Sequence, residues 1–305
     1  MIQARGLTKR YGEKTAVDDV SFTIRPGIVT GFLGPNGAGK STTMRLIVGL
    51  DRPTSGSVTV NGKAYSDNHA PLHEVGALLE AKAVHTSRSA YNHLRVLAAT
   101  HGISDKRVGD VLDLVGLADV GRKRAGAFSL GMGQRLGIAS ALLGDPAVVM
   151  LDEPINGLDP EGIRWVRDLL RGLAAEGRTV FVSSHLMSEM ALTADHVVVV
   201  GRGRVIADVP MEQIIASASS GAVNVRSPQA GALSRALAGH GVTVTQRDGE
   251  HLAVTGLTAT QIAQTALDQR ILVVELTPQQ ASLEEAFMEM TRDSVDYHAH
   301  LGAAA

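Results

Sequence analysis

A glycine-rich loop near the start of the chain constrains its fold more than any other stretch. The loop fits the phosphate-loop pattern G-x-x-x-x-G-K-[ST] without a mismatch. It consists of Gly34, Pro35, Asn36, Gly37, Ala38, Gly39, Lys40, Ser41 and Thr42. Residues 28–33 before it are apolar and partly β-branched, which predicts a buried strand, and residues 43–50 after it have helical spacing. A strand, this loop and a helix in succession predict a phosphate-binding site in an α/β domain.

The residue types of the loop suit a bound nucleotide. Its glycines allow backbone conformations that other residues rarely adopt and a close approach to a ligand. The N–H groups of the loop and the N-terminus of the next helix then form an anion site. In this arrangement Lys40 reaches the terminal phosphates, and the Ser41 hydroxyl can ligate Mg²⁺. We therefore expect a nucleotide and Mg²⁺ as ligands.

The composition argues against several other classes of protein. The net charge of −2 and the pI near 6.6 give no broad basic field of the kind that favours nucleic-acid binding. Cysteine is absent, which excludes disulfides and thiolate metal sites. No stretch approaches the roughly 18 apolar residues of a membrane span, and the N-terminus lacks the apolar region of a signal peptide. We expect a soluble protein that can still dock on a membrane protein.

The patterns of strands and helices divide the chain into parts. Residues 1–216 alternate strand and helix signals, which predicts a mostly parallel sheet with helices on both faces. Within them, residues 85–145 form a helical insert, with helices expected over 90–100, 106–115 and 129–143. After a small polar linker at residues 217–221, residues 222–292 follow the order βαββαβ and end in a last helix. This order predicts a small α+β ferredoxin-like lobe, and residues 293–305 are expected to be a disordered tail.

Polar side chains stand at the ends of several predicted strands, where ligands of such sheets bind. Asp152 and Glu153 follow an apolar run, and in a nucleotide-hydrolysis site the first acid holds Mg²⁺ while the second orients the attacking water. His185 ends a later strand and is either a γ-phosphate contact or a structural histidine. Glu80 ends an earlier strand and could place the metal or the water. Tyr11 lies beside a glycine turn and is either a loop residue or a stacking partner for adenine.

The order of these motifs resembles the ATP-binding cassette (ABC) family of ATPases over residues 2–210. The motifs are Tyr11, the phosphate loop, Glu80, Phe128-Ser129-Leu130-Gly131-Met132-Gly133-Gln134-Arg135, Leu151-Asp152-Glu153-Pro154, Gly157-Leu158-Asp159 and His185. A Ser-x-Gly segment ahead of a helix, followed by an Asp-Glu strand, distinguishes this family from other phosphate-loop proteins. The resemblance implies a phosphate-loop NTPase cassette that binds ATP with Mg²⁺.

The resemblance also implies a head-to-tail dimer of two such chains. Each phosphate loop would be closed by the signature segment, residues 128–132, of the second copy. Ser129 and the Gly131 N–H, flanked by Leu130 and Met132, would contact the γ-phosphate in trans, which suits the free N–H groups of a helix N-terminus. Asp159 would lie at the dimer seam.

Roles for the remaining site residues follow from the same resemblance. Tyr11 would stack on adenine with Val17 beside it. Glu153 would be the catalytic base, and His185 would be the γ-phosphate sensor. Asp152 and Ser41 would hold Mg²⁺.

Two features depart from the usual pattern of the family. The usual signature Leu-Ser-Gly-Gly-Gln is here Phe128-Ser129-Leu130-Gly131-Met132, and the usual glutamine after the 75–79 strand is Glu80. A carboxylate at this position can still ligate Mg²⁺ but adds negative charge near the phosphates. Both variants and the C-terminal lobe resemble the drug and peptide-antibiotic resistance branch, which includes bacitracin and lantibiotic self-protection exporters.

The function implied by the resemblance is that of an ATPase subunit for an exporter of a drug, antibiotic or peptide. A separate integral-membrane permease would dock on the helical insert and the loop after Glu80 and hold the chain at the cytoplasmic face of the membrane. A soluble ABC ATPase acting on ribosomes or DNA is the alternative, although such proteins usually carry two cassettes or a long coiled-coil insert. A non-hydrolysing binding module is a third class, against which the intact Lys40, Asp152, Glu153 and His185 argue. The C-terminal lobe either regulates, dimerises or only buttresses the cassette.

Overall fold

The chain forms two compact units in the computed structural model, which describes residues 1–80, 84–218, 222–239, 241–278 and 287. The first unit runs from Met1 to Met211, and the second covers the described residues from Glu212 onward. Each unit has a hydrophobic core of its own. Among the described residues, no helix is both long enough and apolar enough to cross a membrane.

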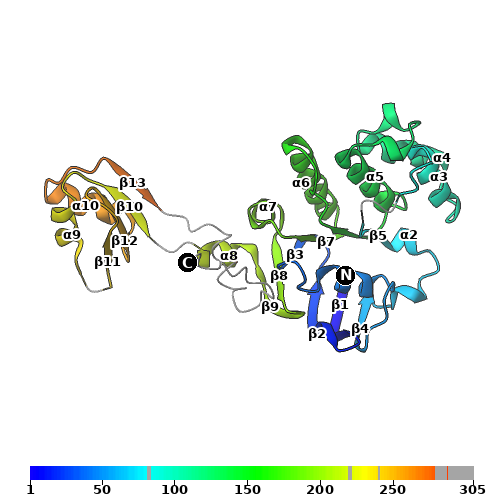
Figure 1. The fold of residues 1–305 in the computed structure, drawn as a ribbon, viewed down its shortest axis with the longest axis horizontal. Coiled ribbons are helices and arrows are strands. Elements are labelled where there is room, and N and C mark those ends of the chain that lie inside the picture. The colour runs from blue at the N-terminus through cyan, green and yellow to red at the C-terminus, as the bar shows by residue number, and fades with distance from the viewer. Residues whose placement is uncertain (81–83, 219–221, 240, 279–286, 288–305) are drawn as a thin grey trace, which may run out of the picture. The chain divides into compact units, whose positions relative to one another are not determined.

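The first unit is built on a six-stranded sheet (Figure 1). Its strands are β3 (Val29–Leu33), β5 (Val75–Leu78), β6 (Val148–Asp152), β7 (Thr179–Ser184), β8 (His196–Gly201) and β9 (Arg204–Pro210). They lie in the order β5-β6-β7-β3-β8-β9, and all pairs are parallel except β8 with β9. The predicted α/β fold with a mostly parallel sheet is therefore confirmed. β3, which leads into the phosphate loop, is buried along its whole length near the middle of the sheet.

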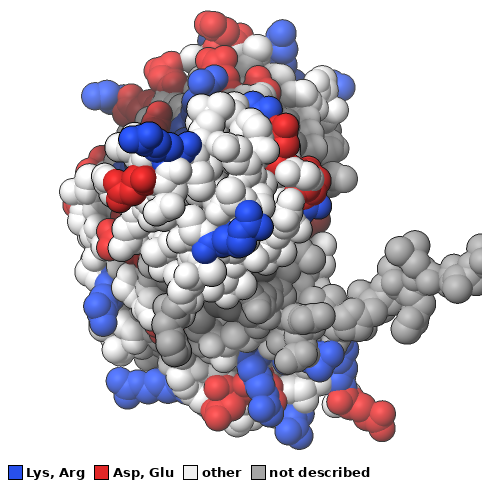
Figure 2. Space-filling model, turned by 90° about the vertical axis from the view of Figure 1, so that its left-hand side faces the viewer, with Lys and Arg blue, Asp and Glu red and all other residues white. Residues whose placement is uncertain are grey.

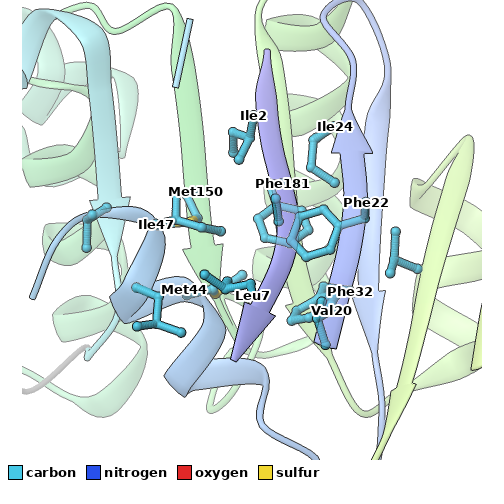
Figure 3. Packing of buried hydrophobic residues seen from close by; sticks show 14 of the residues in the cluster. Ile2, Leu7, Val20, Phe22, Ile24, Phe32, Met44, Ile47, Met150 and Phe181 are labelled. Carbon is cyan, nitrogen blue, oxygen red and sulfur yellow. The ribbon is translucent and has the colours of Figure 1, made fainter. Parts of the chain in front are cut away.

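A smaller antiparallel sheet packs against one face of the large one. It consists of β1 (Ile2–Tyr11), β2 (Lys14–Ile24) and β4 (Ser55–Val60), in the order β2-β1-β4. Figure 3 shows the core between the two sheets, where Phe22, Phe32 and Phe181 point toward one another. Their ring centroids lie 5.1 to 5.9 Å apart in tilted arrangements, which is favourable for aromatic pairs. This core anchors β3 and so fixes the start of the phosphate loop.

Helices of the first unit cover the large sheet and form the insert. They are α1 (Lys40–Ile47), α2 (Pro71–Glu74), α3 (Ala90–Ala99), α4 (Asp105–Leu114), α5 (Leu130–Leu142), α6 (Pro160–Ala175) and α7 (Met187–Thr193), with 3₁₀ turns η1 (Tyr65–Asp67), η2 (Ala118–Val120) and η3 (Ala125–Ala127). Helices α3, α4 and α5 gather beyond β5 at one edge of the sheet (Figure 1). Each of these three helices is preceded by a serine whose Oγ accepts a backbone N–H of the first turn, and these serines are Ser89, Ser104 and Ser129.

The second unit has the predicted order βαββαβ after a leading helix. Its elements are α8 (Met211–Ala218), β10 (Val223–Arg226), α9 (Ala230–Leu237), β11 (Thr243–Gln246), β12 (His251–Thr255), α10 (Ala259–Asp268) and β13 (Glu275–Pro278). The sheet order is β11-β12-β10-β13 with every pair antiparallel, as in ferredoxin-like folds. Leu233, Val254 and Ile262 are fully buried between the helices and the sheet.

Several boundaries differ from those that the sequence predicts. β1 continues through Tyr11 rather than ending at Leu7, and both β9 and α8 are additional elements, so that α8 occupies the start of the predicted linker. The predicted 271–276 strand pairs only from Glu275 onward, because the Leu272 backbone is bonded by the side chains of two other residues, Ser227 and Gln229. The helix predicted after residue 282 and the tail 293–305 lie outside the described residues, apart from position 287.

Candidate nucleotide site

The phosphate loop connects β3 to α1 through a backbone that requires glycine. Gly39 has φ of 97°, and a Cβ at this position would lie 2.4 Å from the Ala16 carbonyl oxygen. A Cβ on Gly34 would lie 2.4 Å from the Val200 carbonyl oxygen. Contacts this close cannot be relieved by rotating a side chain, because the obstructing atoms belong to the backbone. Glycine is therefore required at positions 34 and 39 by the packing of the chain itself, in addition to any requirement of the ligand.

Lys40 is the charged group at the centre of the loop, and its side chain is only 7% exposed. Its ammonium donates hydrogen bonds to the carbonyl oxygens of Gly34 at 2.7 Å and Pro35 at 3.4 Å. The Glu153 carboxylate lies 4.0 Å away. Burial lowers the pKa of Lys40, and the charges of Glu153 and Asp152 partly oppose this shift. The ammonium is thus held inside the loop by its own backbone, where a phosphate would compensate its charge.

The acidic pair at the end of β6 is joined to β7 through Ser183. The Ser183 hydroxyl donates to the Asp152 carboxylate and accepts the Glu153 N–H at 3.0 Å. Glu153 has φ of 50°, a left-handed conformation that is unusual for a residue other than glycine. Its carboxylate accepts a hydrogen bond of 2.9 Å from Nδ1 of His185, which follows β7. The structure therefore brings the predicted base and the predicted sensor into direct contact.

Gln134 is a site residue to which the sequence motifs assign no role. It lies on α5, is 2% exposed, and donates from Nε2 to the Glu153 carbonyl oxygen at 3.1 Å. A buried amide that bonds the backbone of an acid fixes how that acid is presented. The only sequence signal was its place within the segment 128–135 that resembles the family signature.

These residues surround one cavity of about 590 Å³. Predicted site residues that line it are Tyr11, Asn36, Gly37, Gly39, Lys40, Ser41, Thr42, Glu80, Leu130, Asp152 and Glu153. Residues not predicted that also line it are Lys14, Ala16, Leu79, Gln134 and Asn156. A cavity of this size, lined by two lysines, three carboxylates and a helix N-terminus, suits a nucleoside triphosphate.

The predicted base-stacking pair is brought only partly to the cavity. Tyr11 lies at its rim, 47% exposed, and donates its hydroxyl proton to Asp51 at 3.0 Å. The Lys9 ammonium lies 4.8 Å from its ring centroid. Partial burial and the bond to Asp51 raise the pKa of Tyr11. Val17 is completely buried in the core and does not line the cavity. Lys14 and Ala16 are the β2 residues that do.

The signature segment lies at the N-terminus of α5 and contacts the loop after β6. The Ser129 Oγ accepts the Met132 N–H at 3.3 Å. Leu130 is 55% exposed and packs on Gly157, where a Cβ would lie 2.2 Å from its Cδ2. Asp159 caps α6 by accepting the Gly162 N–H at 2.8 Å. Ser129 and Asp159 are both exposed and do not line the cavity of their own chain.

The donor set of the cavity also fits a magnesium ion. Mg²⁺ is usually held by one or two carboxylates together with waters and substrate phosphates. Ser41 and Asp152 line the same cavity, with Glu80 on its wall, and supply oxygen ligands of this kind. Among the described residues, no three or more His, Cys, Asp or Glu side chains lie close enough together to hold a metal ion by themselves. Waters and the phosphate oxygens of a bound nucleotide would therefore have to complete the coordination.

Comparisons with known proteins agree with this site. The model of the ABC transporter family matches residues 17–156, and a domain of unknown function (DUF8746) matches residues 221–284. The bacitracin transport ATP-binding protein BcrA of Bacillus licheniformis is 41% identical over 217 residues, which are 70% of this chain and 71% of that protein. The uncharacterized ABC transporter ATP-binding protein YdbJ of Bacillus subtilis is 33% identical over 295 residues, 95% of each chain.

The fold comparison gives the same result. The dimeric structure of MJ0796, a bacterial ABC transporter cassette, superposes with a TM-score of 0.64 and 25% identity, over 69% of this chain and 99% of that one. The family match begins at residue 17 and ends at residue 156, so it contains the phosphate loop, the signature segment and the acidic pair. This chain belongs to the ABC transporter ATP-binding proteins, the subunits that bind and hydrolyse ATP on behalf of a membrane permease.

Proposed function

We propose that this chain powers the export of a drug, antibiotic or peptide through a separate membrane permease. The main support for ATP hydrolysis by this chain is that one cavity is lined by Lys40, Asp152, Glu153 and Gln134. The export of an antibiotic or peptide is supported by the similarity to BcrA, whose name assigns it to bacitracin transport. The permease would hold the chain at the cytoplasmic face of the membrane.

The arrangement of side chains gives each a role in hydrolysis. Lys40 would exchange its bonds to the loop carbonyls for bonds to the terminal phosphates, which neutralises charge in a partly buried site. Glu153 would accept a proton from the attacking water, because its carboxylate faces the cavity while its backbone is held by Ser183 and Gln134. His185 would orient that carboxylate through its Nδ1. Ser41 and Asp152 would hold Mg²⁺, which supplies positive charge against the phosphate oxygens.

A head-to-tail dimer is supported by the exposure of the signature segment. Ser129, Leu130 and Asp159 lie at the surface of the chain at the N-termini of α5 and α6, where N–H groups favour an anion. Ser129 and the Gly131 N–H would reach the γ-phosphate bound to the second copy. The related cassette MJ0796 has a dimeric structure.

An apolar groove beside β5 is the proposed docking region of the permease. It has a volume of about 590 Å³ and lies between the large sheet and the insert, with Leu72, Val75 and Leu78 on one side and Leu97 on the other. Glu80 lies on its wall as well as on that of the nucleotide cavity. A partner in this groove would therefore lie next to the ATP site.

The net charge of −2 favours a transport partner over a nucleic acid. Lys and Arg side chains on the face in Figure 2 are interspersed with Asp and Glu side chains, and uncharged surface lies between them. Nucleic-acid binders instead gather basic residues on one face. We propose that this protein has no nucleic-acid partner, and a salt-dependent shift of duplex DNA or ribosomal RNA in a gel would contradict this.

Glu153→Gln tests the proposed catalytic role. The carboxamide cannot act as a base, so we expect turnover to fall by about 10² or more while the Kd for ATP changes by less than about threefold. Size-exclusion chromatography with ATP should show a dimer in this variant. The control is Glu250→Gln, an exposed glutamate between β11 and β12 in the second unit, which should keep full activity. Undiminished turnover of Glu153→Gln would remove Glu153 from the mechanism.

A further inference from the structure

Arg135 and Trp165 form a contact between the helical insert and α6, a helix that packs on the large sheet. Arg135 lies on α5 and Trp165 on α6, and the guanidinium carbon is 4.5 Å from the centroid of the indole ring. The Arg135 Nη1 also donates to the carbonyl oxygen of Val115, the C-cap residue of α4, at 3.0 Å. One side chain therefore contacts α4 and α6 while it belongs to α5.

The chemistry of this contact favours a fixed geometry. The positive guanidinium is attracted to the negative face of the indole ring and, at the same time, to the negative end of the α4 dipole. Arg135 has no carboxylate partner within 4 Å among the described residues, so these two contacts hold its charge. A lysine would fix this geometry less well, because its compact ammonium lacks the planar fork of donors.

Near the nucleotide site, α5 also contacts the segment that leads from β6 into α6. Gln134, the neighbour of Arg135, bonds the Glu153 carbonyl, and Leu130 packs on Gly157 ahead of α6. The first turns of α5 thus contact the segment between β6 and α6 at two points. The pair of Arg135 and Trp165 adds a third point, further along α6.

We infer that Arg135 and Trp165 are positioning residues that fix the signature segment relative to Glu153 and Asp159. The body of α5 is held by its packing on β5, β6, α3 and α4, so loss of the contact with α6 does not detach the helix. It lets the N-terminal end of α5 pivot against the segment between β6 and α6. The contacts lie within one chain. Only the expected effect of their loss on turnover rests on the proposed function. In the proposed dimer, a pivot of α5 would misplace Ser129 and the Gly131 N–H over the phosphate of the second copy.

The direct test is amide hydrogen exchange on the full chain without nucleotide. In Trp165→Leu we expect the amides from Met132 to Leu136 to exchange about tenfold faster, while the phosphate-loop amides keep their rates. Trp165→Phe should restore most of the protection, because a phenyl ring still accepts the cation. Arg164→Ala, an exposed neighbour on α6, is the matched control and should leave the pattern unchanged. Equal exchange in Trp165→Leu and the native chain would overturn the inference, as would an increase spread evenly over the first unit.

A second variant guards against loss of folding in the first. Arg135→Gln keeps a good helix former and removes the stacked charge. It should raise the exchange of the same amides, and the emission of Trp165, the only tryptophan in the chain, should change with it. If Arg135→Gln leaves both signals unchanged, the contact does not position α5 and the inference fails.

A second, independent test compares kcat with the Kd for ATP. A contact that only stabilised the fold would not lower kcat while leaving the Kd unchanged. We expect Trp165→Leu to lower kcat about tenfold or more while the Kd for ATP of the single chain stays within about twofold. Trp165→Phe should recover most of kcat. If Glu153→Gln forms no ATP-dependent dimer, the proposed dimer is wrong, and the exchange data alone then decide whether Arg135 and Trp165 position α5.

Discussion

Lys40 shows how a single side chain is prepared for its ligand. Its ammonium is buried, its pKa is lowered by that burial, and its hydrogen bonds go to carbonyl oxygens of its own loop. A bound phosphate would provide the negative charge that the loop carbonyls supply only as dipoles. We therefore expect Lys40 to contribute more to the affinity for ATP than to the free energy of unfolding of the ligand-free chain.

Lys40→Met tests this residue. The variant keeps the apolar stem and loses the charge, so we expect the Kd for ATP to rise about 100-fold, since hydrogen bonds to charged groups contribute about 1.5–3 kcal/mol. Isothermal titration with ATP measures this change. The control Lys106→Met removes an exposed charge on α4 and should bind ATP like the native chain. An unchanged affinity in Lys40→Met would contradict the assigned role of the phosphate loop.

Residues within contiguous motifs could be predicted from the sequence, whereas those joined by tertiary contacts could not. Lys40 and the pair Asp152 and Glu153 follow from local patterns that dictate both residue type and backbone. Gln134 bonds a carbonyl 19 residues away, and that contact exists only because α5 packs beside β6. The burial of Val17 likewise depends on the pairing of β2 with β1, whose register shifts no local sequence pattern shows.

At the level of elements, the altered signature is matched by a glycine in the facing loop. Leu130 stands where the family usually has glycine, and its side chain occupies the space above Gly157. Gly157 also has φ of 76°, which a side chain rarely adopts. The N-terminus of α5 thus packs on the loop before α6, because a large side chain on α5 faces a glycine in that loop.

Gly157→Ala tests this packing. The added Cβ meets Leu130 and a left-handed backbone, so we expect a loss of about 1–3 kcal/mol in the free energy of unfolding and a lower kcat. Adding Leu130→Gly should recover the steric part of that loss, which urea unfolding would measure. Gly172→Ala is the control, because a Cβ within α6 at this position meets no atom within 4 Å and should be neutral or stabilising. Additive effects of the two site changes would exclude the contact.

Elements with clear capping or turn signals were the ones the sequence predicted well. Serines stand at the starts of α3, α4 and α5, and each predicted helix lies within about one residue of the observed one. The hairpin from β8 to β9 was missed although Arg202 and Gly203 both have positive φ, as a two-residue turn requires. Arg204 and Asp208 take exposed positions on β9, but so does Ile206, so the sequence of β9 shows no clear alternation of polar and apolar residues.

The whole molecule consists of two units that each have a complete core. The first core centres on the phenylalanines between two sheets, and the second lies between two helices and a four-stranded antiparallel sheet. The two family matches also fall in different units. Both units are covered by the similarity to YdbJ, which extends over 95% of each chain. Because the second unit has a core of its own, its stability should not depend on nucleotide bound to the first.

Calorimetry should reveal two unfolding transitions. Each unit buries its own apolar residues, so we expect each to unfold separately. ATP at about 100 times its Kd should stabilise the first unit by about 2.7 kcal/mol and leave the other transition where it was. AMP, which lacks the terminal phosphates, is the control and should shift neither transition appreciably. A single transition that moves as a whole with ATP would contradict two independent cores.

The left-handed backbone of Glu153 has a consequence for the stability of the chain. A residue other than glycine in this conformation carries a cost on the order of 1 kcal/mol or more, and asparagine or glycine would fill the position with less strain. Stability alone would therefore favour a residue other than glutamate at this position. Under the proposed function, the residue that bears this cost in stability is the one that acts as the base.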